Sequence, residues 1–109
     1  MACRMKRDPS GDNDFVAPAG PPSVTLVFTA DSPLYRLVSA TYEDVAVPVV
    51  DDSTVTFEVK PGITLLDVVQ VCPDTKTTVH ISEDCGDGTQ QKLRDRRFLK
   101  LDGYRISSI

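Results

Sequence analysis

The chain has 109 residues, a net charge of −4 and 40% hydrophobic residues. This length suits one domain, and an acidic balance with few aromatic residues argues against nucleic acid as a partner. No apolar run reaches the roughly 18 residues that a membrane-spanning helix needs. Aspartates follow the first basic residues, where a signal peptide would carry its apolar core. The sequence therefore predicts neither a secretion signal nor a membrane partner, and it leaves the compartment open.

Residues 1–22 carry four prolines and two glycines, and only Phe15 and Val16 among them are suited to packing. Such a segment buries too little apolar surface to offset the entropy lost on ordering. We therefore expect a disordered tail over 1–22 and a single β-rich domain over 23–109.

Several segments have the alternation or β-branched content that is typical of strands. They are Ser23–Ala30, Leu34–Tyr42, Val45–Val50, Thr54–Val59 and Lys76–Ser82. In the first of them, Val24, Leu26 and Phe28 share one face. A turn at residues 51–53 predicts a hairpin over Val45–Val59, with Pro48 at a sheet edge or a bulge.

Two further segments decide the fold class. Asp102-Gly103 lies between Phe98–Leu101 and Tyr104–Ile106 and predicts a second hairpin, because this pair suits a two-residue turn. Thr64–Cys72 reads as a helix, capped by Thr64 with Asp67 three residues later. One helix on a small sheet is an α+β, β-grasp-like fold. If Thr64–Cys72 is instead a strand, an all-β sandwich follows.

Three cysteines do not define a disulfide framework. Cys72 and Cys85 bracket one strand and could pair in an oxidising compartment; a buried Cys72 and free thiols elsewhere are the alternative. His80 is the single histidine and should point to solvent, away from its apolar neighbours. No pattern gives it a nucleophile, so we expect no enzyme activity.

The charged residues near the C-terminus form two groups. Glu83, Asp84 and Asp87 lack the spacing of a calcium loop, so we expect no metal site. The second group is basic and would suit an anion or an acidic partner if it shares one face. Its members are Lys92, Arg94, Arg96, Arg97 and Lys100, with Arg105 nearby. A solvated surface is the alternative, because aspartates are interspersed.

The run Ser23–Cys72 resembles the start of the C-terminal β domain of the cobalamin carriers: transcobalamin, gastric intrinsic factor and haptocorrin. In the family, a strand ending in a Gly-containing turn precedes a short helix of the S-V-L-x-V-L type, and this chain has T-L-L-D-V-V at the corresponding place. The ending G-Y-R-I-S-S-I is similar to the family's closing strand, with Gly103, Ile106, Ser108 and Ile109 matching. Asp102 replaces the family's Trp.

The resemblance implies a non-enzymatic binding domain whose ligand-facing residues are Gly103, Tyr104, Ile106 and Ser108. Cobalamin is the implied ligand, and a helical domain would supply the other half of its pocket. We expect no cobalamin binding by this chain alone, because a half site loses much of the buried contact area. The alternative function is a protein-interaction module that uses an exposed sheet edge or the basic hairpin. Self-association through the Tyr104–Ile109 edge is a further expectation.

Overall fold

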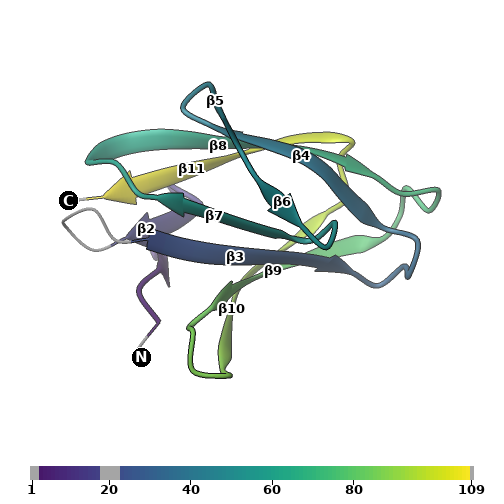
Figure 1. Ribbon diagram of the computed structural model, residues 1–109, viewed down its shortest axis with the longest axis horizontal. Coiled ribbons are helices and arrows are strands. Elements are labelled where there is room, and N and C mark those ends of the chain that lie inside the picture. Colours follow the sequence, from purple (N-terminus) through teal and green to yellow (C-terminus); the bar gives the residue numbers. More distant parts are fainter. Residues whose placement is uncertain (1–2, 18–22, 109) are drawn as a thin grey trace.

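The computed structural model describes residues 3–17 and 23–108, and in these residues every regular element is a strand. The strands form two sheets that pack face to face as a sandwich (Figure 1). The predicted α+β, β-grasp-like fold is therefore wrong. The alternative, an all-β sandwich, is confirmed.

The sheet that we call sheet A has six strands, and sheet B has five. In spatial order, sheet A consists of β1 (Lys6–Arg7), β2 (Phe15–Ala17), β11 (Leu101–Ser108), β8 (Gly62–Val71), β4 (Arg36–Tyr42) and β5 (Val45–Val47). Sheet B consists of β10 (Gln90–Arg97), β9 (Thr78–Asp84), β3 (Ser23–Ala30), β7 (Thr54–Glu58) and β6 (Val49–Val50). Among these strands, only β2 and β11 pair in parallel.

The segment predicted as a helix is β8, a central strand of sheet A. Thr64, Leu66 and Val68 are buried, whereas Leu65 and Asp67 between them are exposed. This period of two fits a strand, and the β-branched residues favour it because they lose rotamer freedom in a helix. Pairing with β4 on one side and β11 on the other then satisfies the backbone of β8.

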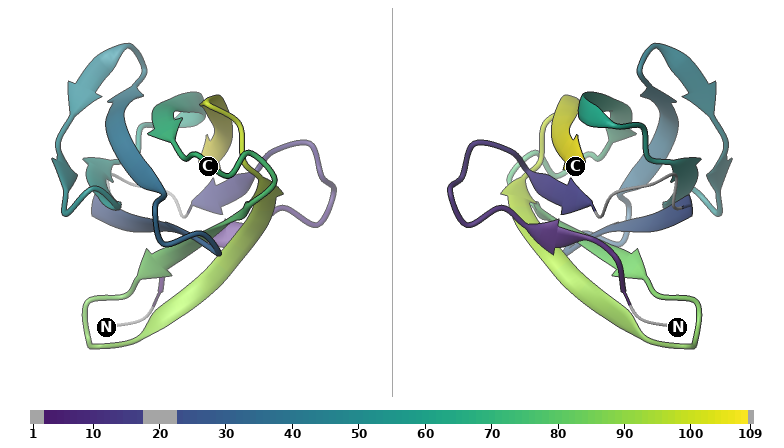
Figure 2. Two further views of the ribbon diagram at one scale, coloured as in Figure 1. Left: turned by 90° about the vertical axis from the view of Figure 1, so that its right-hand side faces the viewer. Right: turned by 90° about the vertical axis from the view of Figure 1, so that its left-hand side faces the viewer.

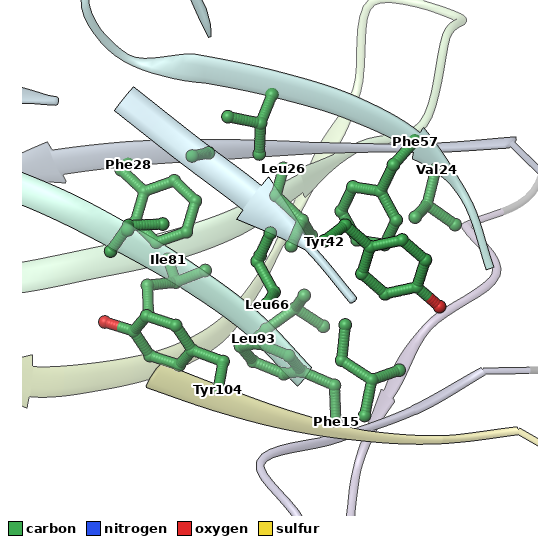
Figure 3. Close-up of a cluster of buried hydrophobic side chains, with 14 of the residues drawn as sticks. Phe15, Val24, Leu26, Phe28, Tyr42, Phe57, Leu66, Ile81, Leu93 and Tyr104 are labelled. Atoms are coloured by element: carbon green, nitrogen blue, oxygen red, sulfur yellow. The ribbon is translucent and has the colours of Figure 1, made fainter. Parts of the chain in front are cut away.

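Aromatic side chains from both sheets fill the core between them (Figure 3). Tyr104 lies 5.8 Å from Phe15 and 5.7 Å from Phe28, measured between ring centroids. Tyr42 and Phe57 form a second pair at 4.5 Å. On β3, the predicted inward residues are Val24, Leu26 and Phe28, and all three are buried, so this prediction is confirmed.

The predicted hairpin over Val45–Val59 is only partly correct. β6 and β7 do form a hairpin, with Val49 opposite Val55. Its turn contains Asp51 and Asp52, both at positive φ. However, β5 belongs to the other sheet, so the chain crosses between the sheets next to Pro48, which cannot donate to a ladder.

The predicted hairpin turn at Asp102-Gly103 is wrong. Both residues lie inside β11, where they pair with Val68 and Asp67. The chain instead turns at residues 98–100, between β10 and β11. The turn propensity of an Asp-Gly pair is overridden here by pairing along the whole of β11.

The predicted tail packs on the sandwich over residues 3–17. Met5 and Phe15 are buried, and β2 pairs along residues 106–108 of β11. The buried Glu83 carboxylate accepts hydrogen bonds from the backbone amides of Arg4 at 3.0 Å and Met5 at 2.9 Å. The disorder prediction is therefore wrong for these residues; its remainder at 1–2 and 18–22 lies outside the described residues.

β11 is also not an edge, so self-association through it is not supported.

A disulfide joins Cys3 to Cys85, and the two Cα atoms are 4.7 Å apart. The suggested Cys72–Cys85 pair is thus wrong: Cys72 is a free, partly buried thiol. The disulfide attaches the N-terminal segment to the β9–β10 hairpin, beside which that segment runs in Figure 2.

Candidate interaction face

The side of sheet A that faces away from sheet B carries a group of exposed apolar side chains; we call this side the outer face. Most of them alternate along β8, and Leu101 lies beside Val69 in the pairing of β11 with β8. The large exposed members are Val38, Ile63, Leu65, Val71 and Leu101, with exposed fractions from 39% to 69%. Apolar side chains gathered on one surface are typical of a protein-interaction site.

The centre of the outer face is hollowed over Gly103. Gly103 pairs with Asp67, and a Cβ atom on this glycine would lie 2.9 Å from Asp67 Oδ1. Only glycine therefore leaves the Asp67 carboxylate undisturbed. The hollow has a volume of about 350 Å³, and Val69 and Leu101 contribute apolar walls to it.

One row further along the same pair of strands, Arg105 lies opposite Leu65. Both residues are exposed. The outer face therefore presents a carboxylate, Asp67, and a guanidinium, Arg105, on neighbouring strands and flanked by apolar side chains. Such a surface combines hydrophobic contact with groups that set orientation.

The residues that the cobalamin-carrier resemblance marks as ligand-facing separate in the structure. Gly103 is on the outer face, but Tyr104, Ile106 and Ser108 are buried on the opposite side of β11. Burial raises the pKa of the Tyr104 phenol, whose hydroxyl donates a hydrogen bond to Asp102 Oδ2 at 3.1 Å. Three of the four predicted positions thus belong to the core or its border.

Asp102 is a buried carboxylate on the same side of β11 as Tyr104. Burial raises its pKa, and the neighbouring Arg96 opposes that shift. Arg96 Nη2 lies 3.0 Å from Asp102 Oδ1, and the guanidinium also stacks over the Tyr104 ring at 4.7 Å. This contact explains why a carboxylate is accommodated within β11.

The predicted basic cluster is divided by its own ion pairs. Arg94 lies 2.8 Å from Asp14 and Arg96 binds Asp102, whereas Lys92 lies 2.5 Å from Asp95. A register shift between Lys92 and Arg94 interrupts the alternation along β10 that would place Lys92, Arg94 and Arg96 on one face. Lys100 lies apart, in the connection to β11. Arg97 is exposed at the end of β10, and the other four residues do not share one anion-binding face.

His80 lies on the outward side of sheet B, as its alternation predicts, but it is held between two carboxylates. Its Nε2 is 2.6 Å from Asp31 Oδ1, and its Nδ1 is 2.7 Å from Asp95 Oδ1. A neutral imidazole has one N–H, so only the imidazolium donates to both aspartates. Both hydrogen bonds raise the pKa of His80, and the one to Asp31 has the larger effect.

This geometry predicts a stability that depends on pH. The folded-state pKa of His80 is raised above its usual value near 6.5. The stability that the two aspartates give to the protonated His80 is therefore fully present below about pH 6.5, and it is lost as the pH rises through the folded-state pKa. Melting temperatures measured from pH 6 to 9 should fall more for the wild type than for His80→Thr. NMR titration of the single histidine should show its pKa falling in Asp31→Asn. A histidine titrating at or below 6.5 would contradict the prediction.

Among residues 3–17 and 23–108 no group of His, Cys, Asp or Glu side chains is arranged to hold a metal ion. In the same residues there is no helix that could cross a membrane. Glu83, from the acidic group, instead holds the N-terminal segment, while Asp84 and Asp87 accept hydrogen bonds in the β9–β10 turn.

Comparisons with protein families, curated proteins and solved structures find no match to this chain. The relationship to the cobalamin carriers therefore stays a prediction, as does the absence of enzyme activity. The segment that the resemblance compares with a short helix is β8.

Sequence reasoning missed the outer face because it predicted a helix over Thr64–Cys72, in which Leu65, Val68 and Val69 would lie on one face. In the strand, Leu65 and Val69 point outward and Val68 points into the core. The sequence did contain a signal for the strand, because a second alternation runs along this segment. Its members are Thr64, Leu66, Val68 and Gln70, and most of the residues between them are also apolar. Apolar side chains on both faces of a strand indicate either a strand buried on both sides or one with a second contact surface.

Proposed function

We propose that the protein is a self-associating interaction module in which two copies pack through their outer faces. The observation that carries the proposal is that large apolar side chains are exposed along the outer face of the two central strands: Ile63 and Leu65 on β8, and Leu101 on β11 opposite Val69. Burying such side chains against a partner removes apolar surface from water, the main favourable term in association.

The sheet edges are less suited to association than this face. β1, β5 and β6 are edge strands of only two or three residues. The remaining edge, β10, is long but carries five charged residues among its eight. Short strands and charged side chains are the features that prevent edge-to-edge pairing. We therefore favour face-to-face packing over both the edge and the basic hairpin.

Charge complementarity favours a second copy of this chain as the partner. A two-fold axis that lies in the interface and runs between Asp67 and Arg105 would place each of these groups over the other in the partner. One pair of residues then forms two equivalent ion pairs, as an isologous interface requires. The hollow over Gly103 leaves room for the guanidinium beside Asp67.

Sedimentation velocity over increasing concentration tests the proposal. The wild type should shift from monomer to dimer, and Leu65→Glu should stay monomeric because it places a charge in the apolar contact. Val50→Glu is the matched control: Val50 is 55% exposed but lies on β6, away from the outer face.

Charge reversal tests the orientation of the two copies. Asp67→Arg alone and Arg105→Asp alone should each weaken the dimer, and the double variant should recover much of the loss. A wild type that stays monomeric up to millimolar concentration, or a Val50→Glu variant as impaired as Leu65→Glu, would refute self-association through this face.

A further inference from the structure

A second hollow lies at one end of the sandwich, where three connections meet. Leu34 comes from the β3–β4 loop, and Val71 is the last residue of β8, followed by Cys72. Phe98 and Lys100 come from the β10–β11 connection. Its volume is about 430 Å³, within the range of small-molecule sites. We call it the end pocket.

The end pocket combines apolar walls with positive charge. Leu34, Val71 and Phe98 supply apolar surface, while the charged side chains that line it are Lys100 and Arg36. No carboxylate lines it, although the chain as a whole has a net charge of −4. Arg36 Nη1 binds Asp52 at 3.2 Å. Within the described residues, the ammonium group of Lys100 has no carboxylate partner.

A buried side chain holds this pocket in shape. Gln70 is fully buried, its Nε2 donates to the Leu99 carbonyl at 2.8 Å, and its backbone amide donates to the Lys100 carbonyl at 2.9 Å. The Tyr35 hydroxyl donates to the Gln70 side-chain oxygen, and the Tyr35 ring packs edge-on against Phe98. The backbone on both sides of Lys100 is therefore fixed before any ligand arrives, which reduces the ordering cost of binding.

We propose that the end pocket binds a small amphipathic anion, with an aryl or alkyl body against Leu34 and Phe98 and its acidic group on Lys100. A charge-assisted hydrogen bond at an otherwise apolar site gives the ligand its orientation. The pocket shares Val71 with the outer face, but its occupancy does not require self-association. The experiment below therefore uses the Leu65→Glu chain alongside the wild type.

The probes are 1-anilinonaphthalene-8-sulfonate, an aryl anion, and N-phenyl-1-naphthylamine, which lacks the sulfonate. Both should bind with a rise in fluorescence, in wild type and Leu65→Glu alike. Lys100→Gln should weaken the anion by roughly tenfold, the loss of one charge-assisted contact, and leave the neutral probe unchanged. Leu34→Asp should weaken both probes. Lys60→Gln, which changes an exposed lysine that does not line the pocket, is the control.

Alkylation of Cys72 by iodoacetamide locates the probe, because this free thiol lines the end pocket. Bound anion should slow the alkylation, and the alkylated chain should bind the anion less. Anion binding that survives both Lys100→Gln and Leu34→Asp would overturn the proposal. So would binding that is lost in Leu65→Glu, since the probe would then occupy the outer face.

Discussion

Reduction of the Cys3–Cys85 disulfide is expected to lower the free energy of unfolding by about 4–5 kcal/mol. The two cysteines are 82 positions apart, so the disulfide closes a loop that contains most of the chain. Opening so long a loop restores much conformational entropy to the unfolded state. The N-terminal segment would then be held by noncovalent contacts alone, among them the burial of Met5 and Phe15, the Glu83 hydrogen bonds and the pairing of β2 with β11.

Urea unfolding with and without a thiol reductant measures this effect, and Cys3→Ser should reproduce it. Cys72→Ser is the control, because that thiol is not in the disulfide and its loss should leave the response to reductant intact. A change below about 1 kcal/mol on reduction would mean that the disulfide does not form or does not constrain the unfolded chain.

Phe15→Ala is expected to cost about 3–5 kcal/mol, the range for removing a large buried aromatic side chain. Phe15 has no exposed surface and stacks on Tyr104 with an interplanar angle of 21°. Its loss leaves a cavity between the sheets and loosens β2 from β11. For a domain of this size, the expected loss is a large share of the total stability.

The same urea unfolding experiment tests Phe15→Ala. Val50→Ala, at an exposed site on β6, should change stability by no more than about 0.5 kcal/mol. If Phe15→Ala behaves like this control, residues 3–17 do not dock on the sandwich, and the disordered tail predicted from composition would be the correct description.

Alternation within single segments was enough to predict several strands. Ser23–Ala30 is β3 with the predicted bounds, and its Val24, Leu26 and Phe28 face the core. His80 points outward, also as predicted. Such local patterns suffice where one face of a strand is apolar and the other polar, because then only one register buries the apolar face.

The two decisive errors concern segments whose neighbours come from far along the chain. Thr64–Cys72 carries both a helical and an alternating pattern, and pairing with β4 and β11 on its two sides selects the strand. Asp102 lies within β11 rather than in a turn. Its buried carboxylate forms an ion pair with Arg96 on β10. Neither partner is visible in the local sequence.

The sequence by itself determined the β-rich character of the chain and the inward residues of β3, because alternation acts within one segment. The tertiary structure decided the long-range arrangement. β2 forms by pairing with β1 and β11, and Cys85 pairs with Cys3 rather than Cys72 because the N-terminal segment returns to the β9–β10 hairpin. The outer face and the end pocket are likewise assembled from separate segments. Long-range contacts of this kind depend on the spatial order of the strands, which periodicity along the chain does not encode.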